Sequence, residues 1–167
     1  MKTVLIRPSN PTGSGYLTEW GFLSTPLGLL QLAGCLLTMD DSEVKVIDME
    51  ADQMQVDRAV DEALDFNPDM VGVTIHASAA HRTSTRIAQS IKEQKKDTLL
   101  IAGGHHATFL PTELLRGGFD VVALGEAKAM TPYSMSGKRQ RARCNSGTFA
   151  ASYSRKITIS SKRRGGR

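Results

Sequence analysis

The sequence predicts a doubly wound α/β domain with a buried parallel sheet of five strands, followed by a basic tail. Short, near-continuous apolar runs of strand length alternate with segments whose apolar residues recur at helical spacing. The runs lack the polar alternation of a sheet with one solvated face, which indicates that helices cover both faces. With 167 residues, of which 40% are hydrophobic and 23% charged, the chain is long enough for one such domain and an appendage.

The first part of this domain reads as strand, helix, strand, helix. Residues 3–7 form an apolar strand, and the long loop after it is rich in Gly, Pro, Ser and Thr. Thr25 and Pro26 predict the start of the first helix, because threonine caps helices and proline is favoured at their first position. Residues 44–48 form the second strand. The apolar positions of the two helices are Leu29, Leu32, Ala33, Leu36 and Leu37, and then Val56, Ala59, Val60, Ala63 and Leu64.

The second part continues the alternation. The run Asn67-Pro68-Asp69 ends the second helix, and residues 70–75 form the third strand. The third helix has one small or apolar face, made of Ala80, Ser84, Ile87, Ala88 and Ile91. Residues 98–102 form the fourth strand, which ends in a glycine pair. Pro111 begins a short fourth helix that Gly117-Gly118 ends, and residues 121–124 form the fifth strand.

Folds of this class bind ligands beyond the carboxyl ends of their strands, where the strand order reverses. The loops that follow the five strands are therefore expected to hold the functional residues. These loops are residues 8–25, 49–53, 76–79, 103–110 and 125–128.

Three chemistries that are common on this fold are disfavoured by the residues in these loops. A dinucleotide fingerprint would use Gly13 and Gly15 with Asp48, but its third glycine falls at Thr18 and the loop is too long. A phosphoacceptor domain needs an aspartate and a lysine where His76 and Glu126 stand. No Walker lysine motif is present. The two cysteines, Cys35 and Cys144, have neither metal-ligand spacing nor a disulfide framework.

The fourth strand is followed by two adjacent pairs of residues, Gly103-Gly104 and His105-His106. Adjacent histidines usually point apart and no further ligand lies at helical spacing, so a backbone-orienting or exposed role is favoured over metal binding. Paired glycines at a strand end permit a positive φ and let a ligand approach the backbone. A tight turn is the alternative interpretation of the glycines.

The run GGHHATFLP at residues 103–111, followed by DVVALGE at 120–126, resembles the cobalamin-binding domain that precedes the catalytic barrel in many radical SAM enzymes. The run PLGLL at 26–30 is similar to the first helix start of that family. Residues 44–48 and 71–74 are similar to its second and third strands. The resemblance covers residues 1–126 in order, so it is specific for the family and not for any one member.

The resemblance implies a flavodoxin-like fold and a corrin ring laid over the strand ends, with its nucleotide tail directed toward the sheet. The cofactor contacts that it implies are Gly28, Thr74, Ser78, Gly103, Gly104, His106 and Thr108. For Gly28, the alternative to a cofactor contact is close packing of the helix on the sheet. For Glu126, the alternative to a cofactor contact is a role at the domain junction. Mutase-type relatives ligate cobalt through a histidine after the first strand. Residues 8–28 contain none, so we expect base-off cobalamin without a protein histidine, or a domain that has lost the cofactor.

The sequence lacks the Cys-x-x-x-Cys-x-x-Cys motif that holds the iron–sulfur cluster of a radical SAM enzyme. We therefore expect a cobalamin-binding module that is not catalytic alone, a fragment whose radical SAM catalytic domain is missing. The cluster, S-adenosylmethionine, and methyl transfer or oxidative ring closure of magnesium-protoporphyrin monomethyl ester belong to the full-length relatives. The alternative is a cofactor-free α/β domain for substrate recognition or protein interaction.

Charge divides the chain at the point where the resemblance ends. All 17 acidic residues lie in residues 1–127 beside 10 Lys and Arg, whereas residues 128–167 hold the other 11 Lys and Arg and no acid. We expect a domain at 1–126 and a disordered, frameshifted tail at 127–167, because loss of one G from GGC-GAA-G turns the family's Gly-Glu into Ala127-Lys128. A basic arm for nucleic acid or an anionic membrane is the disfavoured alternative. With no signal peptide and no membrane span, the expected location is cytoplasmic.

Overall fold

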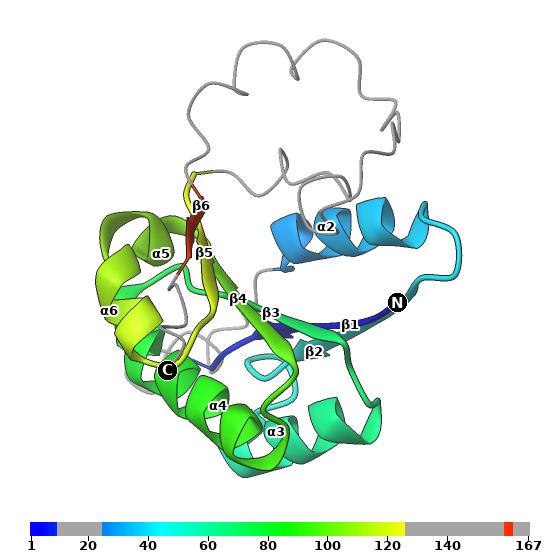
Figure 1. Cartoon of the computed structure of the whole chain (residues 1–167), viewed down its shortest axis with the longest axis horizontal. Helices are drawn as coiled ribbons and strands as arrows, with labels where there is room; N and C mark the ends of the chain where they lie inside the picture. Colours follow the sequence, from blue (N-terminus) through cyan, green and yellow to red (C-terminus); the bar gives the residue numbers. More distant parts are fainter. Residues whose placement is uncertain (10–24, 126–158, 162–167) are drawn as a thin grey trace, which may run out of the picture.

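A computed structural model describes residues 1–9, 25–125 and 159–161 and shows one six-stranded sheet, ordered β2-β1-β3-β4-β5-β6 (Figure 1). The strands are β1 (Lys2–Arg7), β2 (Glu43–Asp48), β3 (Met70–Thr74), β4 (Leu99–Gly103), β5 (Val121–Ala123) and β6 (Ile159–Ser161). The first five are parallel, which confirms the predicted sheet. The short strand β6 was not predicted, and it pairs antiparallel with β5.

The helices are α2 (Leu27–Leu37), α3 (Val56–Asp65), α4 (His81–Gln94), α5 (His105–Phe109) and α6 (Pro111–Arg116), with the 3-10 turn η1 (Ser78–Ala80) leading into α4. The strand ends lie within one residue of the prediction, and the helices differ from it in two respects. Helix α2 begins one residue later, with Pro26 at the N-cap position and no side-chain cap. The predicted loop after the fourth strand contains α5, a helix of five residues that is too short to leave a periodic apolar signal. Pro111 does begin α6.

The strand order places the switch point between β1 and β3. From β1 the chain crosses to β2 on one side, and from β2 it returns past β1 to β3 on the other. The two neighbours of β1 are therefore reached in opposite directions, and their carboxyl ends open a crevice at this point. Arg7 ends β1 opposite Asp48 at the end of β2. Thr74 ends β3 opposite Gly103 at the end of β4.

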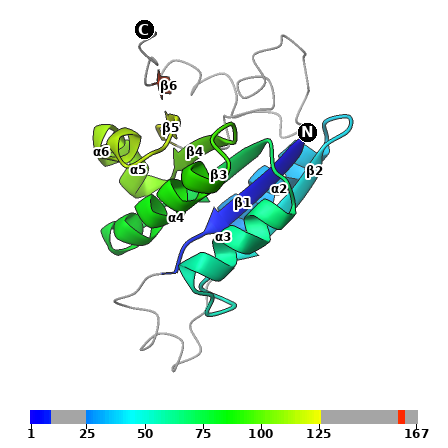
Figure 2. The same cartoon turned by 60° about the horizontal axis from the view of Figure 1, so that its bottom comes forward.

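The two faces of the sheet are covered unequally (Figures 1 and 2). Helices α3 and α4 cover one face, where they bury a large apolar cluster that includes Val60, Ile87 and Ile91. On the other face α2 packs over β2 and β1, and the buried cluster is smaller. Leu36 of α2 is fully buried there, whereas Leu37 is 58% exposed although it belongs to the predicted apolar set.

Helix α2 carries no charged side chain in its 11 residues. Leu29, Ala33 and Leu36 face the sheet, while Leu27 and Leu30 are exposed on the outer side. None of the helices in the described ranges combines the length and the apolar character that a membrane crossing requires.

Candidate ligand site at the carboxyl ends of the strands

The carboxyl ends of four adjacent strands bring together Asp48, Arg7, Thr74 and Gly103. Arg7 pairs with Asp48 in register, and Thr74 pairs with Gly103. Ile6 pairs with Val73, so Arg7 and Thr74 follow on neighbouring strands on either side of the switch point. We call these four residues the carboxyl edge. It combines one cation, one carboxylate, one hydroxyl and one position without a side chain.

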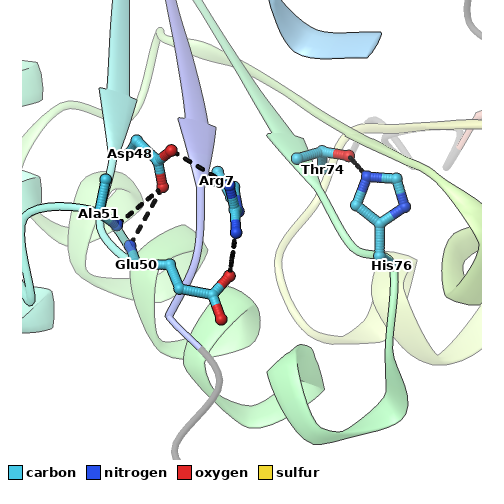
Figure 3. Close-up of polar contacts among 6 residues, drawn as sticks. All are labelled: Arg7, Asp48, Glu50, Ala51, Thr74 and His76. Atoms are coloured by element: carbon cyan, nitrogen blue, oxygen red, sulfur yellow. Dashed lines mark hydrogen bonds and ion pairs between the residues drawn. The ribbon is translucent and has the colours of Figure 1, made fainter. Parts of the chain in front are cut away.

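Arg7 is held at this edge by two carboxylates (Figure 3). Its guanidinium, largely buried, makes ion pairs with Asp48 Oδ2 at 3.2 Å and with Glu50 Oε2 at 2.5 Å. Asp48 Oδ1 in turn accepts hydrogen bonds from the N–H groups of Glu50 and Ala51, each at 3.2 Å. Both oxygens of Asp48 are thus engaged by the protein. A dinucleotide site would need that carboxylate for a ribose hydroxyl.

Thr74 is paired with His76, which sequence reasoning used only to disfavour a phosphoacceptor domain. The hydroxyl of Thr74 lies 3.4 Å from His76 Nε2 (Figure 3). The ring of His105 stands 6.1 Å from that of His76, tilted by 51°. Burial, then His105, then Arg7 lower the pKa of His76, so its imidazole is neutral at pH 7.

The two glycines of the pair, Gly103 and Gly104, have different surroundings. Gly104 has φ +102°, and a Cβ there would meet the carbonyl oxygen of Ile75 at 2.7 Å. That carbonyl accepts the N–H of His106 at 3.0 Å, and the N–H of Ile75 donates to the carbonyl of Gly103 at 2.7 Å. The backbone of the neighbouring loop therefore requires glycine at 104. At Gly103 the nearest atom to a Cβ is Ala123 Cβ at 3.8 Å, which leaves room at the carboxyl edge.

The two adjacent histidines point apart, as predicted. His105 is exposed, whereas His106 is only 7% exposed and is hydrogen-bonded at both ring nitrogens. Its Nδ1 lies 3.2 Å from Ser78 Oγ, and its Nε2 lies 2.8 Å from His81 Nδ1. Burial and His81 lower the pKa of His106, while Glu113 acts in the opposite direction. Sequence reasoning missed His81, because no local pattern links it to residue 106.

Thr108 and Gly28, two of the predicted cofactor contacts, lie in different surroundings in the structure. Thr108 Oγ1 donates to the carbonyl of Gly104 at 3.1 Å and accepts the N–H of Gly125 at 3.0 Å, so it ties the loop after β4 to the end of β5. Gly28 is exposed near the start of α2, and no described atom lies within 4 Å of the place of a Cβ. The alternative of close helix–sheet packing at Gly28 is therefore wrong.

Six of the seven predicted contacts thus lie at the ends of β3 and β4 or in the loops that follow them, and the seventh lies on α2. Within the described ranges, His, Cys, Asp and Glu side chains form no cluster of three or more that could hold a metal ion. Cys35 is partly buried on α2, and Cys144 and Glu126 lie outside the described residues.

Comparison with protein families gives a match to the B12 binding domain over residues 13–132. An uncharacterized methyltransferase of Pyrococcus horikoshii is 32% identical over 130 residues, which are 77% of this chain and 27% of that protein. The anaerobic magnesium-protoporphyrin IX monomethyl ester cyclase of Rubrivivax gelatinosus is 25% identical over 131 residues, 77% of this chain and 23% of the cyclase. The chain thus spans about a quarter of the length of these curated relatives.

Among solved structures, the cobalamin-dependent S-adenosylmethionine radical enzyme OxsB with aqua-cobalamin bound superposes with a TM-score of 0.63 at 15% identity. The match covers 77% of this chain and 17% of the OxsB chain. This likeness supports the parallel α/β fold.

Proposed function

Because the chain belongs to the B12 binding domain family, we propose that it is the cobalamin-binding module of a radical SAM enzyme and is not catalytic alone. The observation that carries the proposal is the pairing, at the carboxyl edge, of Gly103, which has no side chain, with Thr74, which carries a hydroxyl. A ligand with a broad planar ring can approach the backbone at Gly103 more closely than at a residue that has a side chain.

The residues at the carboxyl edge fit such a ligand. Thr74 and Ser78 offer hydroxyl groups to amide or phosphate oxygens, and Gly103 gives the close approach. Gly104, His106 and Thr108 shape the loop that would face the cofactor, and Gly28 leaves space at the start of α2. When bound, cobalamin supplies a cobalt centre that carries an alkyl group. These seven residues are the proposed cofactor contacts.

We propose base-off binding without a histidine ligand from the loop after β1. The four histidines of the sequence are His76, His81, His105 and His106, all in the segments that follow β3 and β4. Residues 8–28 contain none.

The activity of the complete enzyme is a proposal that rests on its relatives. Methyl transfer or oxidative cyclisation, an iron–sulfur cluster, S-adenosylmethionine and a cytoplasmic location belong to this proposal. So does the division into a domain at 1–126 and a frameshifted tail at 127–167. Restoring one base at codon 127 of the gene is expected to open a frame that encodes the three-cysteine motif, and a gene without such a frame would contradict the truncation.

Reconstitution tests the binding function directly. The full chain is mixed with hydroxocobalamin and passed through gel filtration, and we expect bound pigment with a base-off spectrum. A Gly103→Ala variant should retain its melting temperature, because a Cβ there makes an ordinary contact with Ala123 Cβ at 3.8 Å, and should lose most of the pigment. Gly34→Ala on the exposed side of α2 is the matched control and should bind like the native chain. A colourless native protein with a normal melting curve would instead favour a cofactor-free recognition domain.

A further inference from the structure

Three side chains from two separate loops form a continuous hydrogen-bonded chain beside the proposed cofactor site. Ser78 Oγ lies 3.2 Å from His106 Nδ1, and His106 Nε2 lies 2.8 Å from His81 Nδ1. The imidazole rings of His81 and His106 meet edge to face, with centroids 5.0 Å apart. The middle member is buried, Ser78 is exposed and His81 is partly exposed. The chain therefore connects two surface positions through the protein.

Local structure explains why these groups meet. Ser78 is the first residue of η1 and His81 the first of α4, three residues later. Side chains three residues apart in a 3-10 turn lie nearly above one another, so both face the same side. On that side α5 presents His106, whose N–H is fixed by the carbonyl of Ile75. Packing of the two loops thus sets the geometry of the chain.

Two neutral imidazoles allow this chain to run in either direction. In the first arrangement the hydroxyl of Ser78 donates to His106 Nδ1, and His106 Nε2–H donates to His81 Nδ1. Ser78 then offers only lone pairs to a ligand. In the second arrangement His81 Nδ1–H donates to His106 Nε2, and His106 Nδ1–H donates to Ser78 Oγ. Ser78 then keeps its own proton for a ligand.

An added proton is incompatible with the first arrangement, because His81 Nδ1 and His106 Nδ1 both accept hydrogen bonds there and no nitrogen of the chain is free to take it. In the second arrangement Nε2 of His81 has a lone pair that can take the proton while every bond of the chain remains. A proton on His106 instead makes its Nδ1–H a donor to Ser78 Oγ and its Nε2–H a donor to His81 Nδ1, which also keeps both bonds. In each protonated form Ser78 keeps its own proton, so protonation of the histidine pair fixes Ser78 as a donor.

We propose that His81 and His106 are positioning residues through which a proton added to the histidine pair fixes Ser78 as a hydrogen-bond donor toward an acceptor atom of the bound corrinoid. The proposal rests on the proposed function. The titratable neighbours that act most on His106 are His81 on α4 and Glu113 on α6. Burial and His81 lower the pKa of His106, whereas Glu113 opposes this shift.

The relay is tested first without any ligand. Long-range nitrogen–proton correlation spectra of the ¹⁵N-labelled full chain report which nitrogen of each imidazole is protonated. As the pH is lowered from about 8 to 5 we expect His106 to move to a form protonated at Nδ1 as the histidine pair takes up a proton. His76→Asn removes an exposed histidine outside the chain and should leave this behaviour unchanged. A His106 whose protonated nitrogen stays the same over this pH range would overturn the relay.

The effect on the ligand is measured by titrating hydroxocobalamin at pH 7.5 and pH 6.0. We expect the native affinity to rise by up to about twofold on acidification relative to Ser78→Ala in the same buffers, because fixing one of two equally populated arrangements at most doubles the competent fraction. The paired buffers cancel the pH dependence of hydroxocobalamin itself. His81→Gln, which donates but gains no proton, should lose the difference. Binding that responds to pH equally in native and Ser78→Ala protein overturns the inference alone, and absence of native binding at both pH values overturns the proposed function with it.

Discussion

Arg7 Nη1 lies 3.2 Å from Asp48 Oδ2, at the ends of two strands that pair in register. The side chains of Arg7 and Asp48 are 10% and 17% exposed, so removal of the carboxylate takes one charged partner away from a poorly solvated guanidinium. Asp48→Asn should therefore lower the free energy of unfolding by about 1–3 kcal/mol in urea titrations. Glu43→Gln is the control, since its ion pair with Lys2 is exposed and 3.7 Å long, and it should cost less than about 1 kcal/mol. Equal losses would contradict this interpretation.

Gly104 should resist substitution for a reason that lies in the fold. With φ +102° and Ile75 O at 2.7 Å from a Cβ, even Gly104→Ala should destabilise the domain by about 1–3 kcal/mol. Thermal and urea unfolding measure this loss. Gly34→Ala, in an exposed part of α2, should gain up to about 1 kcal/mol.

Two adjacent leucines of α2 should differ widely in their contribution to stability. Leu36 is fully buried against the sheet, so Leu36→Ala should cost about 2–5 kcal/mol through lost contacts and a cavity. Leu37 is 58% exposed, and Leu37→Ala should change the free energy of unfolding by no more than about 0.5 kcal/mol. Chemical denaturation of both variants measures the difference, and similar costs would show that α2 packs in another orientation.

Stability should fall as the pH is lowered through the histidine range. The pKa values of His76 and His106 in the folded protein lie below the ordinary value of 6.5. Below pH 6.5 these two histidines bind protons more readily in the unfolded chain than in the folded chain, so protonation favours unfolding. Melting temperatures measured from pH 7.5 down to pH 5.0 should decrease, with a smaller decrease in His76→Asn. A flat profile in the native protein would contradict the lowered pKa values.

The sequence predicted the fold well because the buried strands and the helices that cover them leave local periodic signals. The stripe Val56, Ala59, Val60 and Ala63 predicts α3, and the structure places Ala59, Val60 and Ala63 in the core. Helix α5 escaped prediction because its five residues are too few to leave a periodic signal, and the bond from the N–H of His106 to the carbonyl of Ile75 links it to a distant loop.

The candidate site could be predicted only in part. The glycine pair and the hydroxyl residues follow strand ends, which sequence spacing reveals. The pairing of Arg7 with Asp48 depends on strand register, and the contact of His81 with His106 joins residues 25 positions apart. Such contacts form only when distant segments of the chain pack together, so no local sequence pattern predicts them.

Gly103 and Gly104 are adjacent, but natural selection would act on them differently. The carbonyl of Ile75 requires glycine at 104 whether or not a ligand is present. A descendant that no longer needed a ligand would keep Gly104 and would be free to acquire alanine at 103, where a Cβ makes an ordinary contact with Ala123 Cβ. In comparisons of related sequences, replacement of the first glycine of the pair would thus identify a domain that no longer binds a ligand at this edge.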